Sequence, residues 1–196
     1  MKGSMKQEEV FKIFRETNAL LSGHFELRSG LHSDQFFQCA LVLQYPQIAE
    51  KLCRAVVDKM RAEKGHTLKV DGVISPALGG IPVGHEMGRA LNVKAIFAEK
   101  QDNKLVLRRA FEIKPGQHFV VAEDVITRGG RVQEVVDIVA SRGGIVEAIA
   151  VLVDRSGGRA QFKAPVFSLL QWEPMTWEPA TCPLCKQGSK AVHPGS

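Results

Sequence analysis

The 196-residue sequence lacks any apolar run that approaches the roughly 20 residues needed to span a bilayer, and its N-terminal segment has no apolar signal core. These two absences predict a cytoplasmic protein with no membrane partner. Internal repeats and low-complexity segments are also missing. Neither GxxxxGK(S/T) nor GxGxxG occurs, which argues against a P-loop kinase and against a dinucleotide-dependent oxidoreductase.

Basic residues are not massed in one block, although the formal charge is +5 and the isoelectric point is near 9.1. Lys and Arg are spread along the whole chain, so the sequence does not favour a nucleic-acid partner. An anionic small substrate accounts for the excess of positive charge equally well.

Cysteine is scarce, with four residues at positions 39, 53, 182 and 185. The close pair Cys182 and Cys185 is weak evidence for zinc, because a closed structural site needs four ligands. His193 could supply a third ligand, and no fourth is obvious in the sequence. We therefore predict no metal held directly by side chains.

The hydrophobic pattern predicts one α/β domain of 21.5 kDa. Apolar residues recur at helical spacing over about residues 7–21 and 46–63. Strands and helices then alternate from 70 to 153, which predicts a mostly parallel sheet flanked by helices, with right-handed crossovers. Near Lys100 a hairpin interrupts this alternation.

The most informative stretch is residues 118–131, where two acids and a glycine turn lie between a hydrophobic strand and an amphipathic helix. Unpaired N–H groups and the helix dipole at the start of that helix attract an anion. Glu123 and Asp124 would lie near the carboxyl end of the strand, where open α/β sheets bind ligands. Adjacent carboxylates suit ribose hydroxyls and a hydrated cation better than a phosphate. The alternative is an ordinary strand-to-helix turn with a solvated acidic pair.

This segment resembles the phosphoribosyl pyrophosphate signature of type I phosphoribosyltransferases. The resemblance implies that the acids bind the ribose hydroxyls and that residues 127–131 bind the 5′-phosphate. Arg128 and Arg131 occupy turn positions where many relatives have Thr, Ala or Ser. The implied binding residues are Glu123, Asp124, Val125, Ile126, Thr127, Arg128, Gly129, Gly130 and Arg131.

Residues 75–82 follow an apolar strand and precede a predicted helix over about residues 81–91. They resemble the pyrophosphate-binding loop of the same family, with Ala77, Leu78 and Gly79 as the implied contacts. Many relatives carry a lysine in place of Gly79, so this loop would act through its backbone N–H groups. Taken alone, it could equally be a plain turn.

Residues 98–109 predict a hairpin tip, since Asp-Asn lies between two apolar segments. Its cations occupy the place of the family's flexible catalytic loop. Lys100 is our first candidate for the catalytic cation, with Lys104 or Arg108 assisting. Without the other motifs, the charges would indicate only a solvated hairpin.

Residues 23–37 resemble the substrate hood of orotate phosphoribosyltransferases. Orotate is a planar pyrimidine with a carboxylate, which an arginine and a stacking aromatic ring can recognise. The implied orotate contacts are Arg28, Phe36 and Phe37, together with Thr127 and with Arg155, which follows the strand at 145–153. The alternatives are core packing for the phenylalanines, a surface charge for Arg28, and a turn or salt-bridge role for Arg155.

The resemblance implies conversion of orotate and phosphoribosyl pyrophosphate into orotidine 5′-monophosphate and pyrophosphate. It also implies Mg²⁺ held mainly by substrate and water, and a homodimer whose hairpin reaches the neighbouring site. The hood would comprise about residues 20–45 and 160–196, around a core of about 68–158. The rivals are a purine phosphoribosyltransferase and a nucleotide-sensing regulator that kept this fold.

Overall fold

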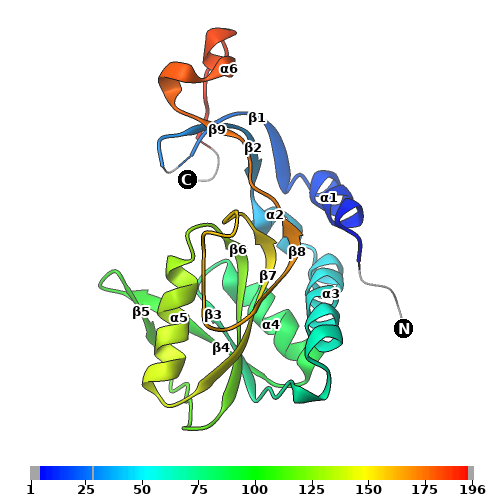
Figure 1. The fold of residues 1–196 in the computed structure, drawn as a ribbon, viewed down its shortest axis with the longest axis vertical. Coiled ribbons are helices and arrows are strands. Elements are labelled where there is room, and N and C mark those ends of the chain that lie inside the picture. The colour runs from blue at the N-terminus through cyan, green and yellow to red at the C-terminus, as the bar shows by residue number, and fades with distance from the viewer. Residues whose placement is uncertain (1–4, 28, 194–196) are drawn as a thin grey trace.

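A computed structural model describes residues 5–27 and 29–193. Its centre is a six-stranded sheet in the order β5-β4-β3-β6-β7-β8, in which only β5 runs antiparallel to its neighbour (Figure 1). The strands are β3 (Gly72–Pro76), β4 (Lys94–Gln101), β5 (Lys104–Leu107), β6 (His118–Ile126), β7 (Ile145–Asp154) and β8 (Val166–Gln171). This confirms the predicted α/β class with a mostly parallel sheet.

Helices cover both faces of this sheet (Figure 1). Alternate residues of β3 and β6 point to opposite sides, and both sides are apolar, as expected for buried parallel strands. Val73 and Val120 pack toward α3 and α4, whereas Ile74 and Val121 pack toward α5. The described helices are α1 (Gln7–Glu16), α2 (Cys39–Leu43), α3 (Pro46–Lys64), α4 (Gly80–Leu91), α5 (Gly130–Ser141) and α6 (Pro183–Lys186), with two short 3₁₀ turns, Gly65–Thr67 and Pro179–Thr181. None of these helices is long and apolar enough to cross a membrane.

A second sheet forms a hood above one edge of the first (Figure 1). Its strands are β1 (Leu20–Glu26), β2 (His32–Phe37) and β9 (Thr176–Trp177), all antiparallel. The hood thus joins a segment near the N-terminus to one near the C-terminus. The sequence predicts that about residues 160–196 belong to the hood, but the apolar strand β8 pairs with β7 in the larger sheet.

The first helix is shorter than the predicted 7–21. It ends at Glu16 because Asn18 adopts a left-handed conformation with φ 54°. Two backbone bonds then close the helix end, from Asn18 N to Arg15 O (3.0 Å) and from Ala19 N to Phe14 O (2.8 Å). This is the Schellman arrangement, and Asn is one of the residues that favour it. The apolar residues that follow belong to β1.

The hairpin of β4 and β5 agrees with the prediction. Asp102 and Asn103 form its two-residue turn with φ 48° and 64°, between the paired residues Gln101 and Lys104. Positive φ at both turn positions is the type I′ pattern that favours Asn and Asp. The hairpin projects from one side of the domain (Figure 1).

Candidate active site

The candidate site lies at the carboxyl edge of the large sheet. From the adjacent pair β3 and β6, the chain order runs outward in opposite directions, to β4 on one side and to β7 and β8 on the other. Loops after β3 and β6 therefore separate here and leave a crevice, which is where open α/β sheets bind ligands. The hood lies above the same edge (Figure 1).

Glu123 and Asp124 lie against the loop that follows β3. Glu123 is only 5% exposed, and Asp124 is half-buried. A Cβ atom built on Gly79 would come within 2.7 Å of Asp124 Oδ2, and one on Gly80 within 3.0 Å of Glu123 Oε1. The two motifs are thus in direct contact. The absence of a side chain at position 79 leaves room for the Asp124 carboxylate, which any larger residue would have to displace.

The pKa of Glu123 is raised by its burial and by its position in the acidic pair. Burial, followed by the nearby charge of Asp124, raises the pKa of Glu123 to about 9. Glu123 consequently holds its proton at neutral pH, while its Oε1 still accepts a hydrogen bond from Asp124 N (3.2 Å). Such a pair can offer sugar hydroxyls both a hydrogen-bond donor and an acceptor. A cation nearby would favour loss of the Glu123 proton, so that both carboxylates would be charged.

The turn after β6 leads directly into α5. Gly129 has φ 79°, and a Cβ atom there would lie 2.8 Å from the Phe162 ring, so this position needs glycine. Thr127, Arg128 and Arg131 are exposed around it. The first turn of α5 and these cations together form a site suited to a phosphate.

A cavity of about 1100 Å³ separates this edge from the hood. Thr127, Arg128 and Arg155 line it from the sheet, and Phe36 lines it from β2. Four further lining residues belong to the hood segment 23–37 that the sequence singles out: Glu26, Leu27, Ser29 and Leu31. The remaining lining residues were not predicted. Gln38 directly follows this segment, whereas the others come close to it only in the folded chain: Arg159, Glu173, Pro174, Thr176 and His193. We call this cavity the hood groove.

Arg155 is the chemically most distinctive side chain in the hood groove. Its Nε atom is buried without a hydrogen-bond partner among the described residues, and burial lowers the pKa of its guanidinium group. The guanidinium lies 5.8 Å from the centre of the Phe37 ring. Burying a cation and leaving one of its N–H donors without a hydrogen bond costs free energy, unless an anion binds there and accepts that hydrogen bond. Arg155 therefore marks an anion site.

The two phenylalanines of β2 have different environments. Phe36 is half-buried and faces the hood groove, whereas Phe37 packs edge-on against Phe14 (ring centroids 5.5 Å apart) and Trp172 (5.0 Å). Adjacent strand residues face opposite sides, so only one can reach the groove. Phe37 instead places the face of its ring against the Arg155 guanidinium. Arg28 lies outside the described residues.

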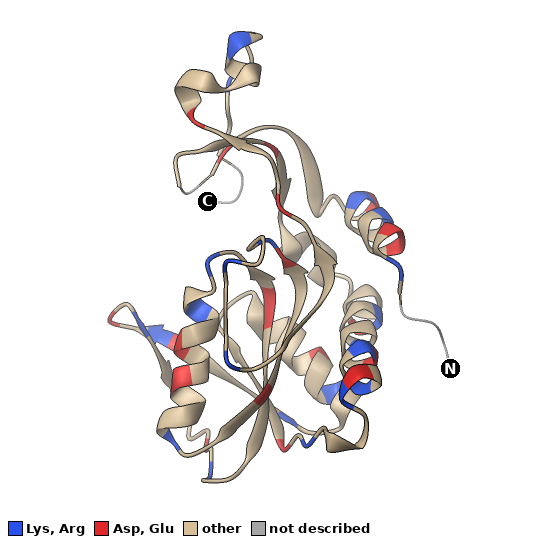
Figure 2. Ribbon diagram, in the orientation of Figure 1, with Lys and Arg blue, Asp and Glu red and all other residues tan. Residues whose placement is uncertain are grey.

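The cations of the hairpin are exposed to solvent. Lys100, Lys104 and Arg108 are exposed, and Arg109 forms a 2.6 Å ion pair with Glu99. Figure 2 shows basic residues both on this hairpin and on the loops above the sheet. Within the described ranges no ion pair joins Lys100 to Glu123 or Asp124.

Comparison with known proteins places this geometry in context. Residues 43–185 match the family model described as "Phosphoribosyl transferase domain". The chain is 50% identical over 192 residues to an orotate phosphoribosyltransferase from Heliobacterium modesticaldum, and the match covers 98% of this chain and 99% of that protein.

Solved structures share the fold at low sequence identity. The Mycobacterium tuberculosis orotate phosphoribosyltransferase has a TM-score of 0.66 and 21% identity, over 84% of this chain and 95% of that one. An adenine phosphoribosyltransferase from Saccharomyces cerevisiae has a TM-score of 0.65 and 20% identity, over 82% and 99%. The fold alone therefore does not distinguish the bases that these two enzymes act on.

Proposed function

The chain belongs to the phosphoribosyl transferase family and, within it, to the orotate phosphoribosyltransferases, and we propose that it transfers the phosphoribosyl group from phosphoribosyl pyrophosphate to orotate in pyrimidine synthesis. The products are orotidine 5′-monophosphate and pyrophosphate. In this transfer a base nitrogen bonds to the sugar carbon, and the bond from that carbon to the pyrophosphate oxygen breaks. The enzyme contributes positioning and electrostatic stabilisation.

The environment of Arg155 is the observation that supports orotate as the base. Orotate has a carboxylate, which adenine and hypoxanthine lack, and an arginine whose buried Nε has no partner among residues 5–27 and 29–193 is suited to bind it. Phe36 lies in the same groove and can contact the planar ring. Thr127 lines the hood groove and is also the first residue of the turn 127–131, which would bind the 5′-phosphate. The base and the sugar phosphate would therefore be adjacent there.

The remaining motifs suit the sugar donor. Glu123 and Asp124 would bind the ribose hydroxyls, and the turn from Thr127 to Arg131 the 5′-phosphate. The loop containing Ala77, Leu78 and Gly79 would bind the pyrophosphate through backbone N–H groups. The contact between this loop and the acidic pair supports the assignment, because the ribose and the pyrophosphate are neighbours in the donor.

The oxygen ligands at this site also fit a Mg²⁺ ion that arrives bound to the substrate. Asp124 and Glu123 offer hard oxygen ligands, but the described residues contain no group of three carboxylates that could enclose an ion. Magnesium dehydrates reluctantly and suits a site with few protein ligands. When bound, it would neutralise negative charge on the pyrophosphate.

We further propose that the enzyme is a homodimer in which the hairpin of β4 and β5 acts on the partner's site. The hairpin projects beyond its own domain, and its exposed cations have no ion pair with the acidic pair of the same chain within the described residues (Figures 1 and 2). Lys100 would neutralise the departing pyrophosphate, assisted by Lys104 or Arg108.

Arg155→Ala should weaken orotate binding about tenfold or more and phosphoribosyl pyrophosphate binding little, since a charge-assisted contact is worth about 1.5–3 kcal/mol. Calorimetric titration of each ligand measures both effects. Arg159→Ala is the matched control, because Arg159 lines the same groove but is exposed and paired with Glu173. Equal losses for the two ligands in Arg155→Ala would assign that residue a structural role instead.

A further inference from the structure

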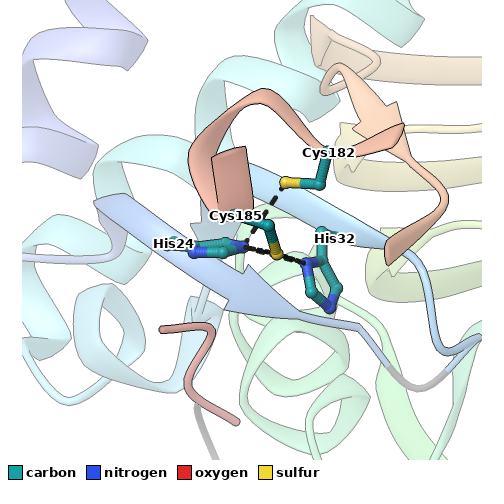
Figure 3. Close-up of side chains that lie close together, drawn as sticks. All are labelled: His24, His32, Cys182 and Cys185. Carbon is teal, nitrogen blue, oxygen red and sulfur yellow. Dashed lines mark hydrogen bonds between the residues drawn. The ribbon is translucent and has the colours of Figure 1, made fainter. Parts of the chain in front are cut away.

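Two histidines and two cysteines from opposite ends of the chain meet in the hood (Figure 3). His24 lies on β1 and His32 on β2, while Cys182 and Cys185 flank the start of α6. One potential ligand atom from each of the four lies within 4.8 Å of every other. None of these side chains lines the hood groove.

The separations are close to those around a single tetrahedral ion. His24 Nε2 lies 2.9 Å from His32 Nδ1 and 3.5 Å from Cys182 Sγ. Cys185 Sγ lies 3.4 Å from His32 Nδ1 and 3.8 Å from His24 Nε2. A zinc ion bound at about 2.0–2.1 Å to nitrogen and about 2.3 Å to sulfur would place nitrogen and sulfur ligands about 3.6 Å apart. Small movements would therefore admit the ion.

Burial makes an unliganded cluster unfavourable. His24, His32 and Cys182 are buried, and His24 Nδ1 has no hydrogen-bond partner among the described residues. If Nε2 of His24 binds a metal, its proton resides on Nδ1, so the ring keeps one unmet donor but gains a strong bond on its other side. Cys185 lies at the exposed side of the cluster and leaves a route by which an ion can enter.

We propose that His24, His32, Cys182 and Cys185 bind one structural zinc ion. Two thiolates and two imidazoles form the Cys₂His₂ set that zinc favours, whereas magnesium and calcium prefer oxygen ligands. Four protein ligands close the coordination sphere, so the ion has a structural and not a catalytic role. Binding requires both thiols to lose their protons.

The ion would fasten the C-terminal segment to the β1–β2 hairpin. Backbone pairing already joins these segments, through β2 with β9 and through the hydrogen bond from Val192 N to His24 O (2.9 Å). The metal adds a link between α6 and both strands of the hairpin. The sequence had suggested His193 as a third ligand, but its Nε2 lies 3.3 Å from Glu26 Oε2 instead.

Metal content of the purified full-length protein tests the site. Protein exposed to zinc and then dialysed should retain about one zinc per chain, measured by mass spectrometry, and Cys182→Ser/Cys185→Ser should retain less than about a tenth of that. His193→Ala is the matched control and should retain the full amount. Retention of zinc by the double cysteine variant would overturn the proposal.

Cobalt substitution tests the wild-type protein without relying on a variant that folds. Protein stripped by a chelator and given Co²⁺ should show the intense visible bands of a tetrahedral site and a thiolate-to-cobalt charge-transfer band. A weak octahedral spectrum would contradict the proposal. So would a disulfide between Cys182 and Cys185 in freshly purified protein, detected by thiol titration under denaturing conditions.

Discussion

Asp124→Asn is expected to lower kcat by about two to three orders of magnitude, the usual effect of removing one preorganised electrostatic group from an active site. The substitution keeps the size of the side chain but removes the charge that would stabilise the sugar as positive charge develops. Asp124 is half-buried beside Gly79 and forms no ion pair within the described ranges, so the melting temperature should change little. Steady-state kinetics and thermal unfolding measure the two effects. Asp137→Asn, at an exposed position on α5, is the control that should leave kcat unchanged.

Glu123→Gln should also lower turnover, and its stability should depend on pH in a characteristic way. The pKa of Glu123 is raised from 4.5 to about 9 in the folded protein. The folded state therefore binds more protons than the unfolded state between these values, and wild-type stability falls as pH rises through this window. The amide of the Glu123→Gln variant does not titrate, so the stability of the variant does not fall in this window for this reason. Its melting temperature relative to wild type should increase between about pH 5 and pH 9. Unchanged kinetics in both acidic variants would refute the assignment of the pair.

Lys100→Ala should be nearly inactive by itself but should complement Asp124→Asn when the two proteins form heterodimers. If the hairpin acts on the partner's site, one of the two sites in each heterodimer combines an intact Lys100 with an intact Asp124. An equal mixture, dissociated and reassembled at random, should recover about a quarter of wild-type activity, because half of the dimers are mixed and half of their sites are intact.

The matched control for this experiment is Lys12→Ala, a change at an exposed position on α1. Mixed with Asp124→Asn and taken through the same dissociation and reassembly, it should show half of the wild-type activity, because half of all sites contain an intact Asp124 whether or not subunits exchange. This control therefore measures how much activity the treatment itself removes. If verified heterodimers of Lys100→Ala and Asp124→Asn recover no activity, then each hairpin serves its own subunit. Activity of Lys100→Ala by itself would show instead that Lys100 is not the essential cation.

The parts of the site that are local in sequence could be predicted from sequence. The acidic pair, the glycine turn before α5 and the Asp-Asn hairpin tip each depend on neighbouring residues, and the structure places all three as expected. The end of the first helix also depends on neighbouring residues, but the apolar spacing predicts a helix that runs to residue 21. The apolar residues of β1 continue the helical pattern, whereas the left-handed conformation of Asn18 stops the helix at Glu16.

The parts that depend on distant segments could not be predicted in this way. Nothing near Cys182 indicates that His24 and His32 lie beside it, because the antiparallel hood brings together positions about 150 residues apart. Likewise, the sequence of β2 alone does not determine which of Phe36 and Phe37 faces the groove. The packing of Phe37 against Phe14 and Trp172 decides it.

The choice of base is tested most directly by the acceptor that the purified enzyme uses. With phosphoribosyl pyrophosphate and Mg²⁺ present, each of orotate, adenine and hypoxanthine is supplied in turn, and nucleotide formation is followed by chromatography. A groove built around Arg155, whose buried Nε has no partner within the described part of the chain, predicts rapid formation of orotidine 5′-monophosphate and no measurable nucleotide from either purine. Preferential use of a purine would contradict the assignment. Failure to use any of the three bases would instead support a regulator that kept the fold.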